Sequence, residues 1–159
     1  MAKRIVALLL LCSLLLTITG CFLETSKTYR YDLETGNQVY IKLTTSTLSS
    51  RNKYDLEVGP PFAVMCDSEI VSKGIFIPKE AYDEYVHAAA FDPKATNLEE
   101  GAKDGNQYLF WEYDGDDGTQ YNYVIWIEDA GVGVLLYNTA SKESARECFS
   151  RLTFSGEAD

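Results

Sequence analysis

Few residues of this chain could take part in reaction chemistry, and they are widely spaced. His87 is the only histidine, and no nucleophile with an orienting acid is evident around it, so we interpret it as an exposed helix residue. The run DGDDG at 114–118 offers oxygens to calcium but lacks the glycine and glutamate positions of an EF-hand, which favours a hairpin turn. The sequence contains no hydrolase, zinc-protease or phosphate-loop motif. We therefore predict no catalytic residue, no metal site and no cofactor.

The first 21 residues form the most specific pattern in the sequence. Lys3 and Arg4 precede a continuous apolar run at 5–16, and the segment TITGC at 17–21 follows. A basic start, a short apolar core and small residues before a cleavage point are typical of a secretory signal. A retained transmembrane helix is the alternative, but it needs about 20 apolar residues and this run is shorter. The pattern predicts export.

The end of this signal, Ile18-Thr19-Gly20-Cys21, resembles the lipobox of bacterial lipoproteins. The resemblance implies a signal peptide at 1–20 and a diacylglyceryl thioether on Cys21, with an acylated amino group in many bacteria. Two or three acyl chains hold a protein on a membrane far more firmly than one. The expected location is the cell membrane or outer membrane, lipid-anchored and facing outside the cytoplasm. Ordinary secretion and a membrane-spanning anchor remain as alternatives.

Cleavage at that point leaves two cysteines without an assigned role. Cys12 leaves with the signal and Cys21 carries lipid, so Cys66 and Cys148 remain as a pair in a compartment where disulfides persist. We predict that they form a disulfide, and the alternative is two buried thiols packed as small hydrophobic groups. Two cysteines and one histidine are too few for a zinc site.

The composition of the mature chain indicates one folded, acidic domain. Removal of residues 1–20 takes two of the 14 basic residues and none of the 24 acidic ones, so the formal net charge changes from −10 to −12. So acidic a surface repels nucleic acid and anionic headgroups, which excludes both as partners. The remaining 139 residues suffice for one core. We divide them into a tether at 21–27 and a single domain at 28–159.

Hydrophobic periodicity predicts an antiparallel α+β domain. Alternating or β-branched apolar residues predict strands at 28–32, 38–44, 54–58, 62–66, 69–77, 108–113, 120–128 and 132–137. The first two form a hairpin, the last three form a meander, and about two helices pack on the sheet. The helices are predicted from Pro78 to Ala90 and, capped by Ser141, from Lys142 to Leu152. The polar segment 93–106 is predicted to be a long loop.

This order of elements resembles that of the α/β/α sandwiches of photosystem PsbP-like and Mog1-like proteins. The resemblance implies only a fold, because function depends on the site rather than on the architecture.

Aromatic side chains of the meander are the remaining candidates for recognition. Strand alternation places them on both faces, and the rings that the helices leave open would form a recognition surface rimmed by acids. The alternative is that a second layer, such as the 79–90 helix, covers them. The candidate binding surface comprises Tyr108, Phe110, Trp111, Tyr113, Tyr121, Tyr123 and Trp126.

These observations together predict a lipid-anchored lipoprotein of the cell envelope with one non-enzymatic domain that binds a protein or an extracellular ligand. An enzyme accessory, or a hydrolase that uses scattered carboxylates, is the second hypothesis, and it needs two acids close together with shifted pKa values. A purely structural envelope protein is the third.

Overall fold

The computed structural model describes residues 24–46 and 52–157, which form ten strands and two helices. In chain order these are β1 (Glu24–Asp32), β2 (Gln38–Ser46), β3 (Tyr54–Glu57), β4 (Phe62–Cys66), β5 (Glu69–Ile77), α2 (Lys79–Phe91), β6 (Ala95–Lys103), β7 (Asn106–Gly115), β8 (Gly118–Ile127), β9 (Val132–Asn138), α3 (Lys142–Ser150) and β10 (Leu152–Ser155).

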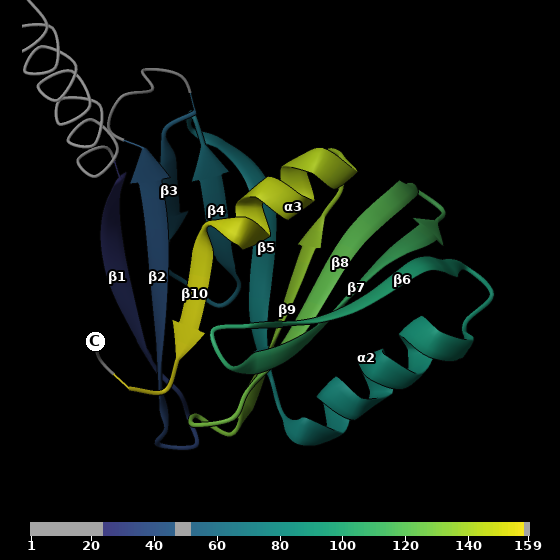
Figure 1. Cartoon of the computed structure of the whole chain (residues 1–159), viewed down its shortest axis with the longest axis horizontal. Helices are drawn as coiled ribbons and strands as arrows, with labels where there is room; N and C mark the ends of the chain where they lie inside the picture. The colour runs from purple at the N-terminus through teal and green to yellow at the C-terminus, as the bar shows by residue number, and fades with distance from the viewer. Residues whose placement is uncertain (1–23, 47–51, 158–159) are drawn as a thin grey trace, which may run out of the picture.

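The strands form two antiparallel sheets (Figure 1). The small sheet has the order β1-β2-β10, and the large sheet has the order β3-β4-β5-β9-β8-β7-β6. Neighbouring strands are antiparallel throughout. The predicted α+β class is therefore confirmed, with the hairpin as β1–β2, the meander as β7–β8–β9 and two helices packed on the sheet.

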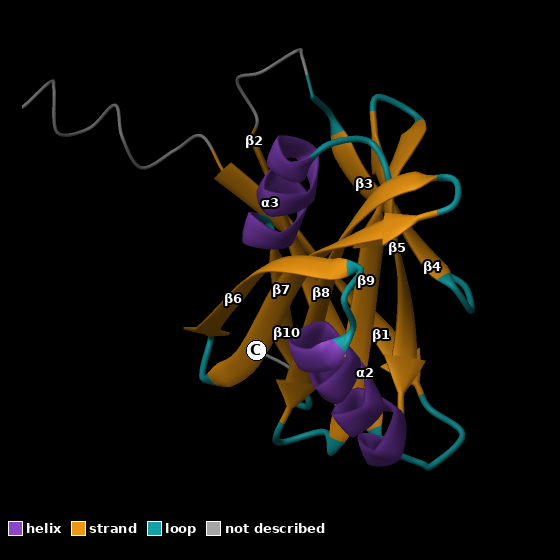
Figure 2. Cartoon of the chain, turned by 90° about the vertical axis from the view of Figure 1, so that its right-hand side faces the viewer, coloured by secondary structure: helices purple, strands orange, loops and turns teal. Residues whose placement is uncertain are grey.

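The large sheet is covered on both faces (Figure 2). Helix α2 lies on its outer face, while α3 and the small sheet share its inner face. Alternation along the strands produces this division: Ile125 of β8 and Val134 of β9 belong to the inner core, whereas Val124 and Leu135 pack under α2. A fully buried side chain of this size stabilises the fold by about 1.5–3 kcal/mol.

Local signals determine where both helices begin. Pro78 precedes the first residue of α2, and its carbonyl oxygen accepts from the Tyr82 N–H at 3.0 Å. The Ser141 hydroxyl caps α3 by accepting from the Ser144 N–H at 3.1 Å. Among the helices that the structure describes, none is long and apolar enough to cross a membrane.

The structure corrects the prediction at three places and confirms it at a fourth. Segment 95–103, predicted as part of a loop, is the edge strand β6. Helix α3 ends at Ser150, and Leu152, predicted as its last inward residue, begins β10 instead. Strand β1 begins at Glu24, so residues 24–27 of the predicted tether belong to the sheet. The predicted DGDDG hairpin turn does connect β7 to β8.

Two asparagine side chains link the small sheet to the large one. Asn106 Nδ2 donates to the Phe154 carbonyl oxygen at 3.1 Å, and its Oδ1 accepts from the Glu128 N–H at 3.2 Å. Asn37 Nδ2, in the turn of the first hairpin, donates to the Ala130 carbonyl oxygen at 2.8 Å. These bonds satisfy polar groups where the sheets meet and set the position of the hairpin turn.

A glycine on β5 allows the tightest packing between neighbouring strands. Gly74 lies opposite Phe62 of β4, and a Cβ atom at position 74 would lie 2.1 Å from Phe62 Cζ. The Phe62 ring is fully buried and occupies the space that any side chain at 74 would need.

The Gly74→Ala variant is therefore expected to lower the free energy of unfolding by about 1–3 kcal/mol, because the Phe62 ring must move within a packed core. Chemical denaturation measures this change. The double variant Phe62→Leu with Gly74→Ala should lose less than the sum of the two single variants. Gly59→Ala is the control, since its Cβ would meet its nearest neighbour at 3.4 Å. Strict additivity would contradict the proposed clash.

Candidate functional site

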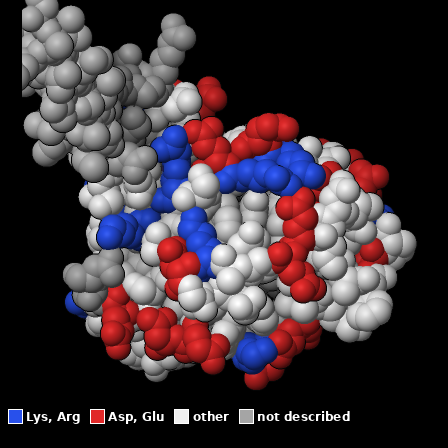
Figure 3. Space-filling view, in the orientation of Figure 1, with Lys and Arg blue, Asp and Glu red and all other residues white. Residues whose placement is uncertain are grey.

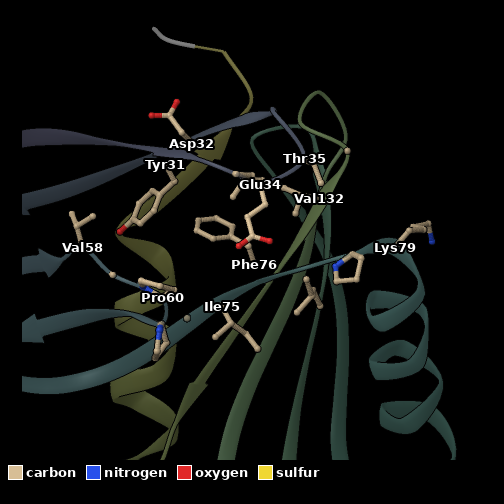
Figure 4. Close-up of a pocket in the computed structure, with 17 residues that line it drawn as sticks. Tyr31, Asp32, Glu34, Thr35, Val58, Pro60, Ile75, Phe76, Lys79 and Val132 are labelled. Atoms are coloured by element: carbon tan, nitrogen blue, oxygen red, sulfur yellow. The ribbon is translucent and has the colours of Figure 1, made fainter.

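A hollow lies where the turn of the first hairpin approaches the large sheet. We call it the hairpin cavity; it has a volume of about 740 Å³ and is lined by residues 31–35, 58–61, 74–79 and 131–132 (Figure 4). These segments are the end of β1 with its turn, the β3–β4 loop, the end of β5 and the start of β9. The site therefore exists only once both sheets have packed together.

Turn chemistry shapes the walls of the hairpin cavity. In the first hairpin, the Gly36 N–H donates to the Leu33 carbonyl oxygen at 2.9 Å, and Gly36 has a φ of +86°, which glycine adopts without strain. On the opposite wall, Pro60 and Pro61 are joined by a cis peptide bond. Val58, two positions before Pro60, is 58% exposed. The cavity is thus bordered by two short loops rather than by regular structure.

Tyr31 and Phe76 line the floor of the hairpin cavity and pack against a third aromatic ring, that of the fully buried Phe62. The Tyr31 ring centroid lies 5.0 Å from that of Phe76 and 5.7 Å from that of Phe62, and the Phe62 and Phe76 centroids lie 5.6 Å apart. All three rings are tilted with respect to one another, as aromatic pairs prefer. The ring of Phe62 occupies the space beside Gly74 that a side chain would otherwise fill. This close contact between β4 and β5 supports the cavity floor.

The hydroxyl group of Tyr31 is an unsatisfied polar group beside the hairpin cavity. The residue is only 8% exposed, and its Oη atom is buried without a hydrogen-bond partner. Burial raises the pKa of Tyr31 well above its ordinary value. In Figure 4 the hydroxyl points along the wall toward Val58. A buried hydroxyl without a partner costs about 1–3 kcal/mol, so this position favours a molecule that supplies one.

Charged side chains around the hairpin cavity differ in whether they are paired. Asp32 accepts from Arg30 Nη2 at 2.9 Å, and this bond lowers the pKa of Asp32. Lys79 pairs with Asp83 and points away from the cavity. Glu34 extends over the cavity in Figure 4, and within the described residues its carboxylate has no ion pair or side-chain hydrogen bond.

A second, smaller hollow lies next to α3, and it differs from the hairpin cavity because its lysine has hydrogen-bond partners within the protein. It has a volume of about 350 Å³ and contains the side chain of Lys103. Lys103 Nζ donates to the carbonyl oxygens of Phe149 at 2.7 Å and Ser150 at 2.8 Å, the last residues of α3. Burial lowers the pKa of Lys103. Because this lysine already has partners within the protein, the second hollow does not require a ligand.

The structure divides the predicted aromatic surface between two cores. Phe110 and Tyr123 are buried on the inner face, where Tyr123 stacks on Phe149 at 4.0 Å. Trp111 is buried under α2 on the outer face. The other four rings are half-buried: Tyr108, Tyr113, Tyr121 and Trp126. The seven rings therefore do not form one open face, because each side of the sheet has its own cover.

The predicted cysteine pair lies in the inner core. Cys148 of α3 is buried, Cys66 at the end of β4 packs against the same core, and both are free thiols in this structure. Burial raises the pKa of the Cys148 thiol to about 12, so it is protonated at neutral pH. The disulfide stays a prediction. Cys21 lies outside the described residues, and His87 is exposed on α2 as predicted.

No family model, curated protein or solved structure matches this chain. The function is therefore inferred from the geometry of the site. Within residues 24–46 and 52–157, no cluster of three or more His, Cys, Asp or Glu side chains gathers that could hold a metal ion. The hairpin cavity is the feature that combines an apolar hollow, an unpaired charge and an unsatisfied hydroxyl.

The Tyr31→Phe variant tests whether the Tyr31 hydroxyl lacks a partner. Removal of an unsatisfied hydroxyl should leave the stability unchanged or raise the free energy of unfolding by about 1 kcal/mol. Tyr29→Phe is the matched control from the same strand, because the Tyr29 hydroxyl donates to Asp55 Oδ1 at 2.6 Å. This control should lower the stability by about 1 kcal/mol. Equal losses in both variants, measured by denaturation, would contradict our interpretation of Tyr31.

The same pair of variants has a predictable pH dependence. The hydrogen bonds from Tyr29 and Lys27 lower the pKa of Asp55 from 3.8 to about 2. Because the pKa is lower in the folded state, the stabilisation is complete above pH 4 and is lost as the pH falls toward 2. The stability difference between Tyr29→Phe and the unmodified protein should therefore shrink over this pH interval, while that of Tyr31→Phe stays constant.

Proposed function

We propose that this protein is an exported, lipid-anchored binding module of the cell envelope, and that the hairpin cavity is its binding site for a small, largely apolar ligand. The observation that carries the proposal is the Tyr31 hydroxyl, buried and unpartnered next to an apolar hollow of about 740 Å³. That volume falls within the range of about 300–1,000 Å³ that is usual for small-molecule sites. The cavity has apolar walls and few polar groups, which are also features of such sites.

The sequence and the direction of β1 support an arrangement in which the cavity opens away from the membrane. Cys21, the proposed site of acylation, precedes the first residue of β1 by three positions. Strand β1, labelled in Figure 1, then runs from Glu24 to Asp32. Asp32 is part of the lining of the hairpin cavity. Eight steps of about 3.3 Å span about 26 Å. An anchor at Cys21 would leave the cavity at the opposite end, where it can receive ligands from outside the cell.

The shifted carboxyl groups favour a binding module over a carboxylate hydrolase. A general acid needs a raised pKa. Among the described carboxyl groups, the resolved shifts are all downward: Arg30 lowers the pKa of Asp32, Tyr29 and Lys27 lower that of Asp55, and Lys142 lowers that of Glu112. The hydrolase or enzyme accessory remains the second candidate. A purely structural role is third, because it does not account for the unpaired Tyr31 hydroxyl.

The anchor is tested by the Cys21→Ser variant. Without the thiol no thioether can form, so the protein should move from the membrane fraction to the soluble fraction or accumulate as an unprocessed precursor. Fatty-acid labelling of the unmodified protein and of the variant, followed by fractionation, measures this. Cys12→Ser is the control and should keep the label. Failure of the unmodified protein to incorporate label would overturn the lipoprotein proposal.

Ligand binding is tested with 1-hexanol, a small neutral amphiphile, and the full-length chain in lipid nanodiscs. In an NMR titration, amide resonances of residues 31–35 and 74–77 should shift and saturate. Thr35→Trp places a large ring at the edge of the cavity and should weaken binding by roughly a factor of ten. Thr119→Trp, in the β7–β8 hairpin, is the control and should bind normally. Shifts scattered over the whole domain would contradict a defined site.

A further inference from the structure

We infer that the hairpin cavity selects ligands that carry a positive charge next to an apolar group, as alkylammonium ions do. This inference rests on the proposed function, because it specifies the ligand class of the same site. It starts from Glu34, whose carboxylate extends over the cavity in Figure 4 and has no ion pair within the described residues.

Glu34 determines which sign of ligand charge the cavity prefers, because the neighbouring charged side chains are already paired. Arg30 is engaged by Asp32 and so does not neutralise Glu34. Lys79 is held by Asp83 and by the faces of Tyr82 and Trp126, at 5.0 and 5.3 Å from their centroids. Among the described residues that line the cavity, the one cation, Lys79, is thus occupied elsewhere, and the unpaired Glu34 leaves the lining with an excess of negative charge.

The surface around the cavity has the same sign. Figure 3 shows acidic side chains gathered at the end of the molecule where the first hairpin turns. The whole chain carries a formal net charge of −10. Acidic surroundings raise the local concentration of cations and oppose anions, so they add to the preference of Glu34.

The apolar part of the ligand is specified by the cavity floor. Phe76 and Tyr31 form an aromatic pair there, and Val58 and Pro60 form the facing wall. An alkyl chain on this floor would lose contact with water, while its ammonium group stays near Glu34 at the solvent boundary. A primary ammonium also donates hydrogen bonds, which the Glu34 carboxylate can accept.

Access to the Tyr31 hydroxyl requires a local movement. Its oxygen is covered in this structure, and in Figure 4 it points toward Val58. Because Val58 is 58% exposed, its side chain can move without disturbing the core. A ligand that reaches this hydroxyl would enter beside Val58, so the amide of Val58 is expected to report binding.

Three probes with the same six-carbon chain test this inference: hexylammonium, 1-hexanol and hexanoate, each titrated by NMR into the full-length chain in nanodiscs at pH 7. Hexylammonium should bind about three- to fivefold more tightly than 1-hexanol, and hexanoate should bind most weakly. Added salt should reduce the advantage of hexylammonium, because exposed charges are screened. The Glu34→Gln variant should lose most of this preference and keep only the smaller part that the acidic surroundings supply.

Glu100→Gln is the matched control, because it removes one exposed acid of β6, outside the cavity lining, and should keep the preference. Equal affinity of the three probes, or an unchanged preference in Glu34→Gln, would overturn the charge selectivity alone. Absence of saturable shifts with all three probes would instead overturn the proposed function of the cavity.

Discussion

The packing of the small sheet against the inner face of the large sheet is the contact on which the rest of the structure depends. Val39, Ile41 and Leu43 of β2 are fully buried in it, together with Leu152 and Phe154 of β10. Strand β10 pairs with β2, so elements from both ends of the domain meet in one sheet. The hairpin cavity is a consequence of this arrangement, because it lies where the turn of the first hairpin approaches the large sheet.

Elements with a strong hydrophobic period could be predicted from the sequence, and those without one could not. The alternation in β8 and β9 separates two cores, and the stripe of Ala145, Cys148 and Phe149 faces the sheet as predicted. Strand β6 is exposed along most of its length as an edge strand, so its polar sequence has no period. Leu152 is buried in either position, since a helical i+7 residue and the first residue of β10 face the same core.

The candidate site could not be predicted because its residues come from four separate segments. Gly59-Pro60-Pro61 and the turn at 34–37 are both visible as breaks in the sequence, but nothing in the chain indicates that they face each other. Tyr31 has the alternation of an ordinary core residue, and only the structure shows that its hydroxyl lacks a partner. The aromatic residues of the meander are numerous, yet they act mainly as packing for α2 and α3.

The rigidity of the cavity differs between its floor and its walls, and this difference bears on how a ligand would be bound. Phe62 is held against Gly74, and Phe76 packs on the same aromatic group, so the floor is part of the core and is organised before a ligand arrives. A preformed surface reduces the entropy that binding must overcome. The walls are the hairpin turn and the loop with Val58, which have fewer core contacts. The floor would therefore supply the apolar contact that most small amphiphiles share, whereas Glu34 on the turn would discriminate among their head groups.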